Sequence, residues 1–187
     1  LTEYYNYTSD EADEFIAGPC FQAWWGMNNL EGWGGPNPDW WYERQAVLSK
    51  KICDRMRELG MQPVLPGFSG MVPSNFTEKT GISSNSQGEW CGFKRPHILD
   101  PNSEAFETMA ANYYKVLEEV MGTSAYYSMD PFHEGGNTAG VNLDAAGRAV
   151  MDAMKKCNPE AVWVIQAWQE NPRVPMIENR KSGDMLV

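Results

Sequence analysis

The 187-residue sequence contains few of the residues that commonly hold metal ions or phosphate groups. It has two histidines, His97 and His133, and no two of its four cysteines have the C-x-x-C spacing of zinc ribbons and redox motifs. His133-Glu134 is not followed by the second histidine of H-E-x-x-H, and no glycine-rich loop ends in Gly-Lys-Ser/Thr. Metal-dependent hydrolysis would need Asp or Cys ligands. It remains an alternative, but we expect no metal and no cofactor.

The sequence also has little positive charge and no long apolar run. Its 15 Lys and Arg are outnumbered by 25 Asp and Glu, which gives a net charge of −10 and an isoelectric point near 4.6. Nucleic acids and anionic membrane surfaces bind clustered Lys and Arg, so we expect neither as a partner. No apolar stretch approaches the ~18 residues that a membrane-spanning helix needs, and the first residues have no signal-peptide pattern.

Aromatic residues, in contrast, are abundant: the chain has eight Trp, eight Tyr and seven Phe. Aromatic planes pack against the C–H faces of sugar rings, so a surplus of aromatic residues in loops would suit a carbohydrate ligand. For any single aromatic residue, packing in the core is the alternative interpretation. The composition indicates a globular protein and is compatible with sugar binding.

Short apolar runs alternate with amphipathic patterns along the chain. The apolar runs predict buried strands, and weaker signals predict two more. These strands are expected at 20–25, 61–68, 125–129 and 161–168, and more weakly at 97–100 and 183–187. Apolar residues at three- and four-residue steps predict the helices between them. These helices are expected at 10–16, 38–59, 101–121, 142–157 and 173–181.

Three local features are also predicted from the pattern. Ser9 is expected to cap the first helix, and Asn37 the second. The second helix should bury one apolar stripe, made of Leu48, Ile52, Met56 and Leu59. Residues 74–95, rich in Ser, Asn, Gly and Thr, are expected to form a long connection with Trp90 near its end, and its length favours a functional role.

Near-continuous apolar strands separated by amphipathic helices indicate a parallel sheet covered by helices, which is an α/β fold. Both a (β/α)8 TIM barrel and an open doubly wound sheet fit this order. The barrel is favoured because no G-x-G-x-x-G follows a strand and because polar, aromatic loops follow several strands. A whole barrel takes about 250 residues. Residues 1–187 are therefore expected to be an incomplete portion of one catalytic barrel domain, whose start and end lie outside the chain.

The stretch 125–136 is the leading candidate for catalytic chemistry. An apolar run ends there in Asp130, Glu134 and two glycines, and the carboxyl ends of strands are where α/β enzymes place catalytic groups. Glu134 is thus the first candidate for a catalytic carboxylate. The alternative is a structural role, in which Asp130 binds backbone amides and both acids cap a helix or pair with a basic residue. Three other loop acids are expected to be mostly solvated: Glu31, Glu89 and Glu170.

Four motifs, in order and across nearly the whole chain, resemble those of one enzyme family. They are MNNLEGWGGP at 27–36, LGMQPVLPGFSGMVP at 59–73, DPFHE at 130–134 and AVWVIQAW at 161–168. Taken together, these motifs resemble the α-N-acetylglucosaminidases of glycoside hydrolase family 89. The resemblance implies a retaining exo-glycosidase on a (β/α)8 barrel. Such an enzyme releases terminal α-linked N-acetylglucosamine from glycans such as heparan sulfate or mucin.

The resemblance also implies roles for individual residues. Glu134 matches the general acid/base, and the nucleophilic glutamate is expected beyond Val187. The residues implied to bind substrate are Trp90, Trp168, His133, Asn29 and Trp33. Relatives of this kind are secreted or periplasmic in bacteria and lysosomal in animals, which is the location expected here.

Retaining hydrolysis requires two carboxyl groups about 5–5.5 Å apart, one protonated and one ionised. With one matched carboxylate in the chain, a second function therefore stays open. In that alternative the chain binds N-acetylglucosamine through Trp90, Trp168 and Trp33 without catalysis.

Overall fold

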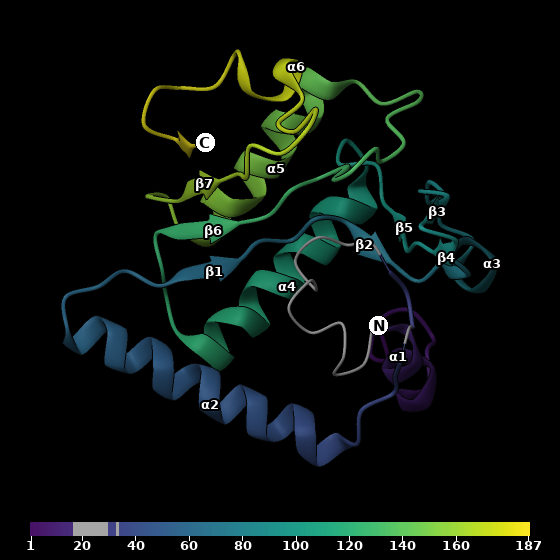
Figure 1. Ribbon diagram of the computed structural model, residues 1–187, viewed down its shortest axis with the longest axis horizontal. Helices are drawn as coiled ribbons and strands as arrows, with labels where there is room; N and C mark the ends of the chain where they lie inside the picture. Colours follow the sequence, from purple (N-terminus) through teal and green to yellow (C-terminus); the bar gives the residue numbers. More distant parts are fainter. Residues whose placement is uncertain (17–29, 33) are drawn as a thin grey trace.

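A four-stranded parallel sheet lies at the centre of the computed structural model, which describes residues 1–16, 30–32 and 34–187 (Figure 1). Its strands are arranged in the order β1-β6-β7-β8. They are β1 Val64–Pro66, β6 Tyr126–Ser128, β7 Val162–Val164 and β8 Met185–Leu186. Each neighbouring pair is parallel. The predicted parallel sheet is therefore confirmed, while the strand expected at 20–25 lies outside the described residues.

A helix follows or precedes each strand of this sheet, as a β/α repeat requires. The helices are α2 Asp39–Glu58, α4 Glu104–Met121, α5 Leu143–Cys157 and the short α6 Val174–Ile177. Helix α4 packs against both α2 and α5, and α5 packs against α6 and β7. In Figure 1, α4 lies between α2 and α5 along the sheet. Parallel strands need such crossover connections because a tight turn cannot join them.

The core lies between the sheet and helices α4 and α5. Helix α4 buries Phe106, Ala110, Tyr114 and Leu117, which recur at steps of three and four residues. Burying a large apolar side chain contributes about 1.5–3 kcal/mol. On the sheet, Trp163 of β7 is the largest of the fully buried side chains. Its Nε1 donates a hydrogen bond to the carbonyl oxygen of Met129 at 2.9 Å. Strand β7 and the segment after β6 are thereby joined inside the core.

Two helix starts differ from the sequence prediction. Helix α1 (Ser9–Phe15) is capped by Thr8, which exchanges hydrogen bonds with Glu11 in a capping box, so the predicted cap Ser9 is wrong. Helix α2 begins after Pro38, whose ring has no side-chain acceptor, so the predicted cap Asn37 is also wrong. In both places a residue with capping chemistry lies one position from the actual helix start.

The predicted apolar stripe of α2 does not become core within the described residues. Leu48, Ile52 and Leu59 are about half exposed, and the buried residue of this helix is Cys53. The periodicity correctly identified a helix. It could not show which part of the apolar side packs against α4, because a pattern defines a stripe and not its partner.

The long connection from β1 to α4 contains short elements that the sequence did not predict. It contains β2 Met71–Val72, α3 Phe76–Thr80, β3 Glu89–Trp90, β4 Phe93–Lys94 and β5 His97–Ile98. Strand β5 confirms the weak strand signal, but it pairs antiparallel with β2 and lies outside the main sheet. Strands β3 and β4 form a hairpin through Cys91 (φ 51°) and Gly92 (φ 78°). Positive φ at both loop residues is the requirement of a two-residue hairpin turn.

Two further observations concern the cysteines and the helices. The described cysteines Cys53, Cys91 and Cys157 are free thiols. In the described part of the chain, no helix has the length and apolar character needed to cross a membrane.

Candidate active site

The loops that follow β1, β6 and β7 gather at one edge of the sheet, because the three strands are parallel. Glu134 lies in the loop after β6, and Trp168 lies in the loop after β7. The loop after β1 contains the β3–β4 hairpin and with it Trp90. Three of the residues singled out in the sequence thus come from three loops at the carboxyl ends of neighbouring strands.

Glu134 and Trp168 are in direct contact. The indole Nε1 of Trp168 donates a hydrogen bond to Oε1 of Glu134 at 2.9 Å, while the Trp168 side chain is 47% exposed. Two reciprocal backbone bonds between Trp168 and Asn171 hold the indole-bearing loop in shape. The structure therefore places a carboxyl group beside an accessible aromatic plane, as a sugar site requires.

The backbone that presents Glu134 is strained. Phe132 (φ 59°) and Glu134 (φ 45°) both lie in the left-handed region, which typically costs non-glycine residues of order 1–3 kcal/mol. Gly136 makes this tight turn possible, because a Cβ there would lie 2.5 Å from Cα of Phe132. Such geometry persists where the surroundings enforce it.

Arg95 supplies part of that enforcement from the loop after β1. Its Nη2 donates to the carbonyl oxygen of His133 at 2.7 Å, and its Nη1 donates to that of Glu134 at 3.0 Å. The Arg95 side chain is buried, and burial lowers its pKa from the ordinary value while the charge of Glu134 opposes that shift. One guanidinium group thus binds the backbone on both sides of the Glu134 Cα.

Asp130 joins the β6 and β7 loops beneath Glu134. Its Oδ1 accepts hydrogen bonds from the backbone N–H of Gln166 at 2.8 Å and from Nδ2 of Asn171 at 3.1 Å. Burial raises the pKa of Asp130 above its ordinary value, and the bonds from Gln166 and Asn171 act in the opposite direction. The expectation that Asp130 binds backbone amides is confirmed.

His133 lies inside the protein, with 1% of its surface exposed. Its Nδ1 is 3.7 Å from Oδ2 of Asp130, and neither ring nitrogen has a hydrogen-bond partner among the described residues. The ring therefore faces the interior beside Asp130. Its role as a substrate ligand stays a prediction.

Trp90 is tied to the Glu134 loop through the base of its hairpin. Gln87 accepts a hydrogen bond from the backbone N–H of Asn137 at 2.8 Å, and Nδ2 of Asn137 donates to the carbonyl of Ser86 at 3.2 Å. The partly buried Trp90 is thereby held on the same side as Glu134. Asn29 and Trp33, also predicted to bind substrate, lie outside the described residues.

The remaining loop acids divide into two kinds. Glu170 and Glu89 are exposed as expected, and Glu170 pairs with Arg173. Glu31 is not solvated: its side chain is 11% exposed and accepts hydrogen bonds from the backbone N–H and hydroxyl of Ser74. The prediction for Glu31 is wrong because the antiparallel β2–β5 region brings backbone donors to it, which its position in the sequence does not indicate.

Three residues that organise this site were missed from the sequence, namely Arg95, Gln87 and Asn171. Each binds a residue at least 38 positions away in the sequence. For Arg95 the one available signal was its residue type, a basic residue between Lys94 and Pro96. Nothing in that local pattern separates a buried arginine from an exposed one.

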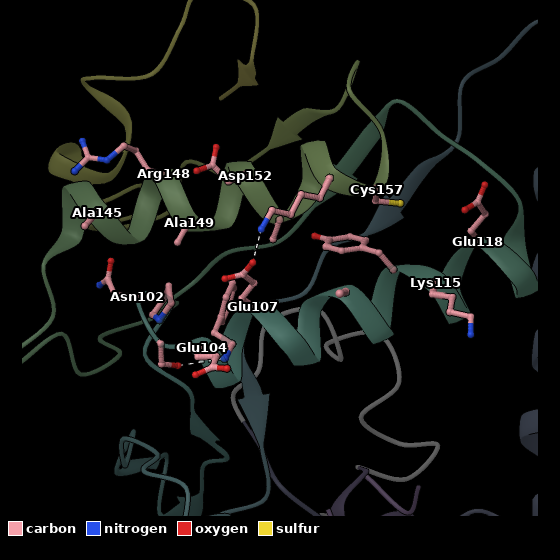
Figure 2. A pocket seen from close by; sticks show the side chains of 17 residues that line it. Asn102, Glu104, Glu107, Lys115, Glu118, Ala145, Arg148, Ala149, Asp152 and Cys157 are labelled. Atoms are coloured by element: carbon pink, nitrogen blue, oxygen red, sulfur yellow. Dashed lines mark hydrogen bonds and ion pairs between the residues drawn. The ribbon is translucent and has the colours of Figure 1, made fainter. Parts of the chain in front are cut away.

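A groove of about 650 Å³ lies elsewhere, between α4 and α5 (Figure 2). Its lining carries charges of both signs, including Glu104, Lys115 and Asp152, and an ion pair between Glu107 and Lys156 crosses it. TIM-barrel active sites lie at the carboxyl ends of the strands and not between the outer helices. This groove is therefore not the candidate active site. Among the described residues, no three His, Cys, Asp or Glu side chains are grouped so as to hold a metal ion.

Comparison with known proteins identifies the family. The model of the α-N-acetylglucosaminidase (NAGLU) TIM-barrel domain matches residues 1–187. The chain belongs to this family. The human α-N-acetylglucosaminidase is 35% identical over 168 residues, which are 86% of this chain and 23% of the human protein. The chain thus spans about a quarter of the length of this relative.

Solved structures of a family 89 glycoside hydrolase from Clostridium perfringens are also similar. The complex with 2-acetamido-1,2-dideoxynojirmycin has a TM-score of 0.90 and 41% identity over 95% of this chain and 21% of that one. The complex with PUGNAc has a TM-score of 0.93 and 40% identity over 98% and 22%. A variant with two glutamates replaced by glutamine, in complex with its substrate GlcNAc-α-1,4-galactose, has a TM-score of 0.90 and 40% identity.

These similarities decide the fold. The predicted family and the predicted TIM barrel are both confirmed, and the open doubly wound sheet is excluded. The β1-β6-β7-β8 sheet is a portion of that barrel. The edge that carries Glu134, Trp168 and Trp90 is consequently the carboxyl-terminal face of the barrel, where enzymes of this fold bind substrates.

Proposed function

We propose that the polypeptide containing this chain is a retaining exo-glycosidase that hydrolyses terminal α-linked N-acetylglucosamine. The observation that carries the proposal is the contact between Glu134 and Trp168 at the carboxyl-terminal face of a family 89 barrel. Ligands of the Clostridium perfringens relative support the substrate class, since they include the substrate GlcNAc-α-1,4-galactose.

In this proposal Glu134 is the general acid/base. It donates a proton to the glycosidic oxygen as the bond breaks, and it then removes a proton from the water that releases the sugar. The nucleophile is a second glutamate, which we place beyond Val187. The substituted pair of glutamates in the relative's substrate complex supports a two-glutamate mechanism.

Trp168 has two roles in this mechanism. Its exposed indole plane packs against the sugar ring, and its Nε1 orients the Glu134 carboxyl group. Trp90, held by the hairpin that is joined to Asn137, forms a second aromatic wall. His133, Asn29 and Trp33 complete the proposed substrate contacts. Glycans such as heparan sulfate or mucin are the proposed natural substrates, and a secreted or periplasmic location would give access to them.

The test uses the full-length polypeptide that contains this chain, with aryl α-N-acetylglucosaminides of good and poor leaving groups. Glu134→Ala is expected to lower kcat/KM by about 10²–10⁴-fold on poor leaving groups, because these need a proton. Good leaving groups are expected to be affected much less, and azide is expected to restore turnover. Glu170→Ala, which removes an exposed carboxylate from the neighbouring loop, is the matched control and is expected to have little effect.

The outcomes separate the proposed functions. Equal loss on both substrates, with no azide effect, would exclude Glu134 as the acid/base. Binding of N-acetylglucosamine without any turnover by the unmodified protein would instead support a carbohydrate-binding role. Proton NMR of the first product tests retention, which predicts that α-N-acetylglucosamine appears before its β-anomer.

A further inference from the structure

Arg95 is a buried cation at the candidate active site, with 4% of its surface exposed. Among the described residues it forms no ion pair with a carboxylate within 4 Å. Its two terminal nitrogens bind the carbonyl oxygens of His133 and Glu134. Burying a guanidinium group that has no carboxylate in direct contact is unfavourable, and the charge of nearby Glu134 offsets only part of that cost, so the position of this group requires an explanation.

The two carbonyl groups that Arg95 binds belong to the two peptide planes on either side of the Glu134 Cα. Fixing both planes fixes φ and ψ of Glu134, and with them the direction of its Cα–Cβ bond. The left-handed φ of 45° would relax toward a commoner conformation without such a restraint. A planar fork of donors suits this task, since it holds two acceptors at once in a fixed geometry.

We propose that Arg95 is a positioning residue for Glu134, whose guanidinium fork aims the acid/base carboxyl group at the glycosidic oxygen; this inference rests on the function proposed above. In this proposal the buried Arg95 does not contact the substrate. It acts through the backbone of the turn after β6, from a segment that follows the β3–β4 hairpin.

Arg95 also joins the acid/base to the hairpin that carries Trp90. Its backbone N–H donates to the carbonyl of Gly88 at 3.2 Å, which closes the base of that hairpin. A separate tie, between Gln87 and Asn137, holds the same hairpin against the same loop without touching the carbonyls of His133 or Glu134. Loss of the Arg95 side chain should therefore disturb Glu134 more than it disturbs Trp90.

The two ties provide a matched pair of variants in the full-length polypeptide. Arg95→Lys keeps the positive charge but cannot bridge two carbonyl groups with a planar fork. It is expected to lower kcat/KM on poor leaving groups by about 10- to 100-fold, because small misplacement of a catalytic group has effects of this size. On good leaving groups it should change kcat/KM, which reports the first step, less than about threefold. On these substrates kcat reports the second step, in which Glu134 is the base, and is expected to fall as well. Gln87→Leu, the control, is expected to affect all leaving groups alike.

Chemical rescue provides a second readout. Arg95→Ala removes the fork and leaves space for a free guanidinium ion. Millimolar guanidinium chloride is expected to restore kcat on poor leaving groups at least tenfold without changing KM. Sodium chloride at the same ionic strength should have no such effect. A purely structural role for Arg95 predicts recovery of the melting temperature but no dependence on the leaving group.

The results that would overturn the inference are distinct from those that concern the function. If the unmodified enzyme hydrolyses the aryl glycosides but Arg95→Lys lowers kcat/KM equally for all leaving groups, Arg95 does not act through the acid function of Glu134. Unfolding of Arg95→Lys, measured by circular dichroism, would assign the residue to the fold and also overturn the inference. Failure of the unmodified enzyme to hydrolyse any of them overturns the proposed function itself, and this inference with it.

Discussion

Replacing Trp168 by Phe tests the one hydrogen bond made by the Glu134 carboxyl group whose geometry is described. The change removes the Nε1–H that donates to Oε1 over 2.9 Å and keeps a flat aromatic ring. Hydrogen bonds to charged groups contribute about 1.5–3 kcal/mol. Because the Trp168 side chain is 47% exposed, water can replace the lost donor. We therefore expect a coupling below that range, about 1 kcal/mol.

A double-mutant cycle on protein stability measures this coupling independently of catalysis. The free energies of unfolding of Trp168→Phe, Glu134→Ala and the double variant are compared with that of the unmodified protein in urea. The smaller ring of Phe loses some packing in both arms of the cycle, so that part cancels and the pairwise energy remains. The expected coupling corresponds to about a fivefold factor in an equilibrium or rate constant.

The control cycle combines Glu134→Ala with Trp40→Phe. Trp40 has an exposed ring like Trp168 and lies on α2, where it packs beneath Arg44. No coupling is expected for this pair, since well-separated sites are additive within about 0.3–0.5 kcal/mol. A Trp168–Glu134 coupling no larger than that of the control would refute the claim that the bond orients the carboxyl group.

Two further predictions concern the surroundings of the site. Gly147→Ala should destabilise the protein by about 1–3 kcal/mol in urea unfolding, because the new Cβ would lie 2.1 Å from the carbonyl oxygen of Met176. This overpacking cost exceeds the gain in helix propensity from Gly to Ala, which is about 1 kcal/mol. A net gain in stability would contradict the packing of α5 on α6. Asp130→Asn tests pH dependence. Burial raises the pKa of Asp130, so the folded state binds its proton more tightly than the unfolded state does, and stability declines as pH rises from near 4 through the raised pKa. The free energy of unfolding of Asp130→Asn, relative to that of the unmodified protein, should therefore increase between pH 3 and pH 7. The control Asp152→Asn, at an exposed position, should show no such trend. A pH-independent difference for Asp130→Asn would argue against a buried, destabilising charge at Asp130.

The parts of the fold that could be predicted are those that local periodicity determines. Helices α4 and α5 were found because their apolar residues recur at helical steps and face a core that lies within the chain. Strand β6 was found because an apolar run ends in turn-forming residues. The position of Glu134 at the end of β6 followed directly from that strand assignment.

The parts that failed depend on partners distant in sequence. The stripe at Leu48, Ile52 and Leu59 has the correct period, but burial depends on what packs against it and not on the period. Strands β2 and β5 each have only two residues and exist because they pair with each other across the 24 residues between Val72 and His97. Single-strand patterns carry no information about such pairing.

The sequence identified individual residues of the candidate site, and the structure showed how they are arranged. Glu134 and Trp168 were named from the sequence, but the sequence gives no distance between them, and their contact depends on the Trp168–Asn171 turn. Arg95 could not have been named, since its role is to bind backbone carbonyl groups, which every residue has. A side chain that binds backbone groups needs no particular residue type as its partner, so the sequence does not indicate the pair.

That property explains how the acid/base is held. Three side chains from outside the Glu134 turn bind backbone atoms across the loops: Arg95 binds the carbonyls of the turn itself, Gln87 binds the N–H of Asn137, and Asp130 binds the N–H of Gln166. When a residue is substituted, its backbone N–H and carbonyl groups stay in place unless the new side chain changes the path of the chain. The direction of the Glu134 carboxyl group is therefore set by neighbouring loops, so changes at Arg95 or Asp130 should alter catalysis more than changes to the exposed side chains of the turn.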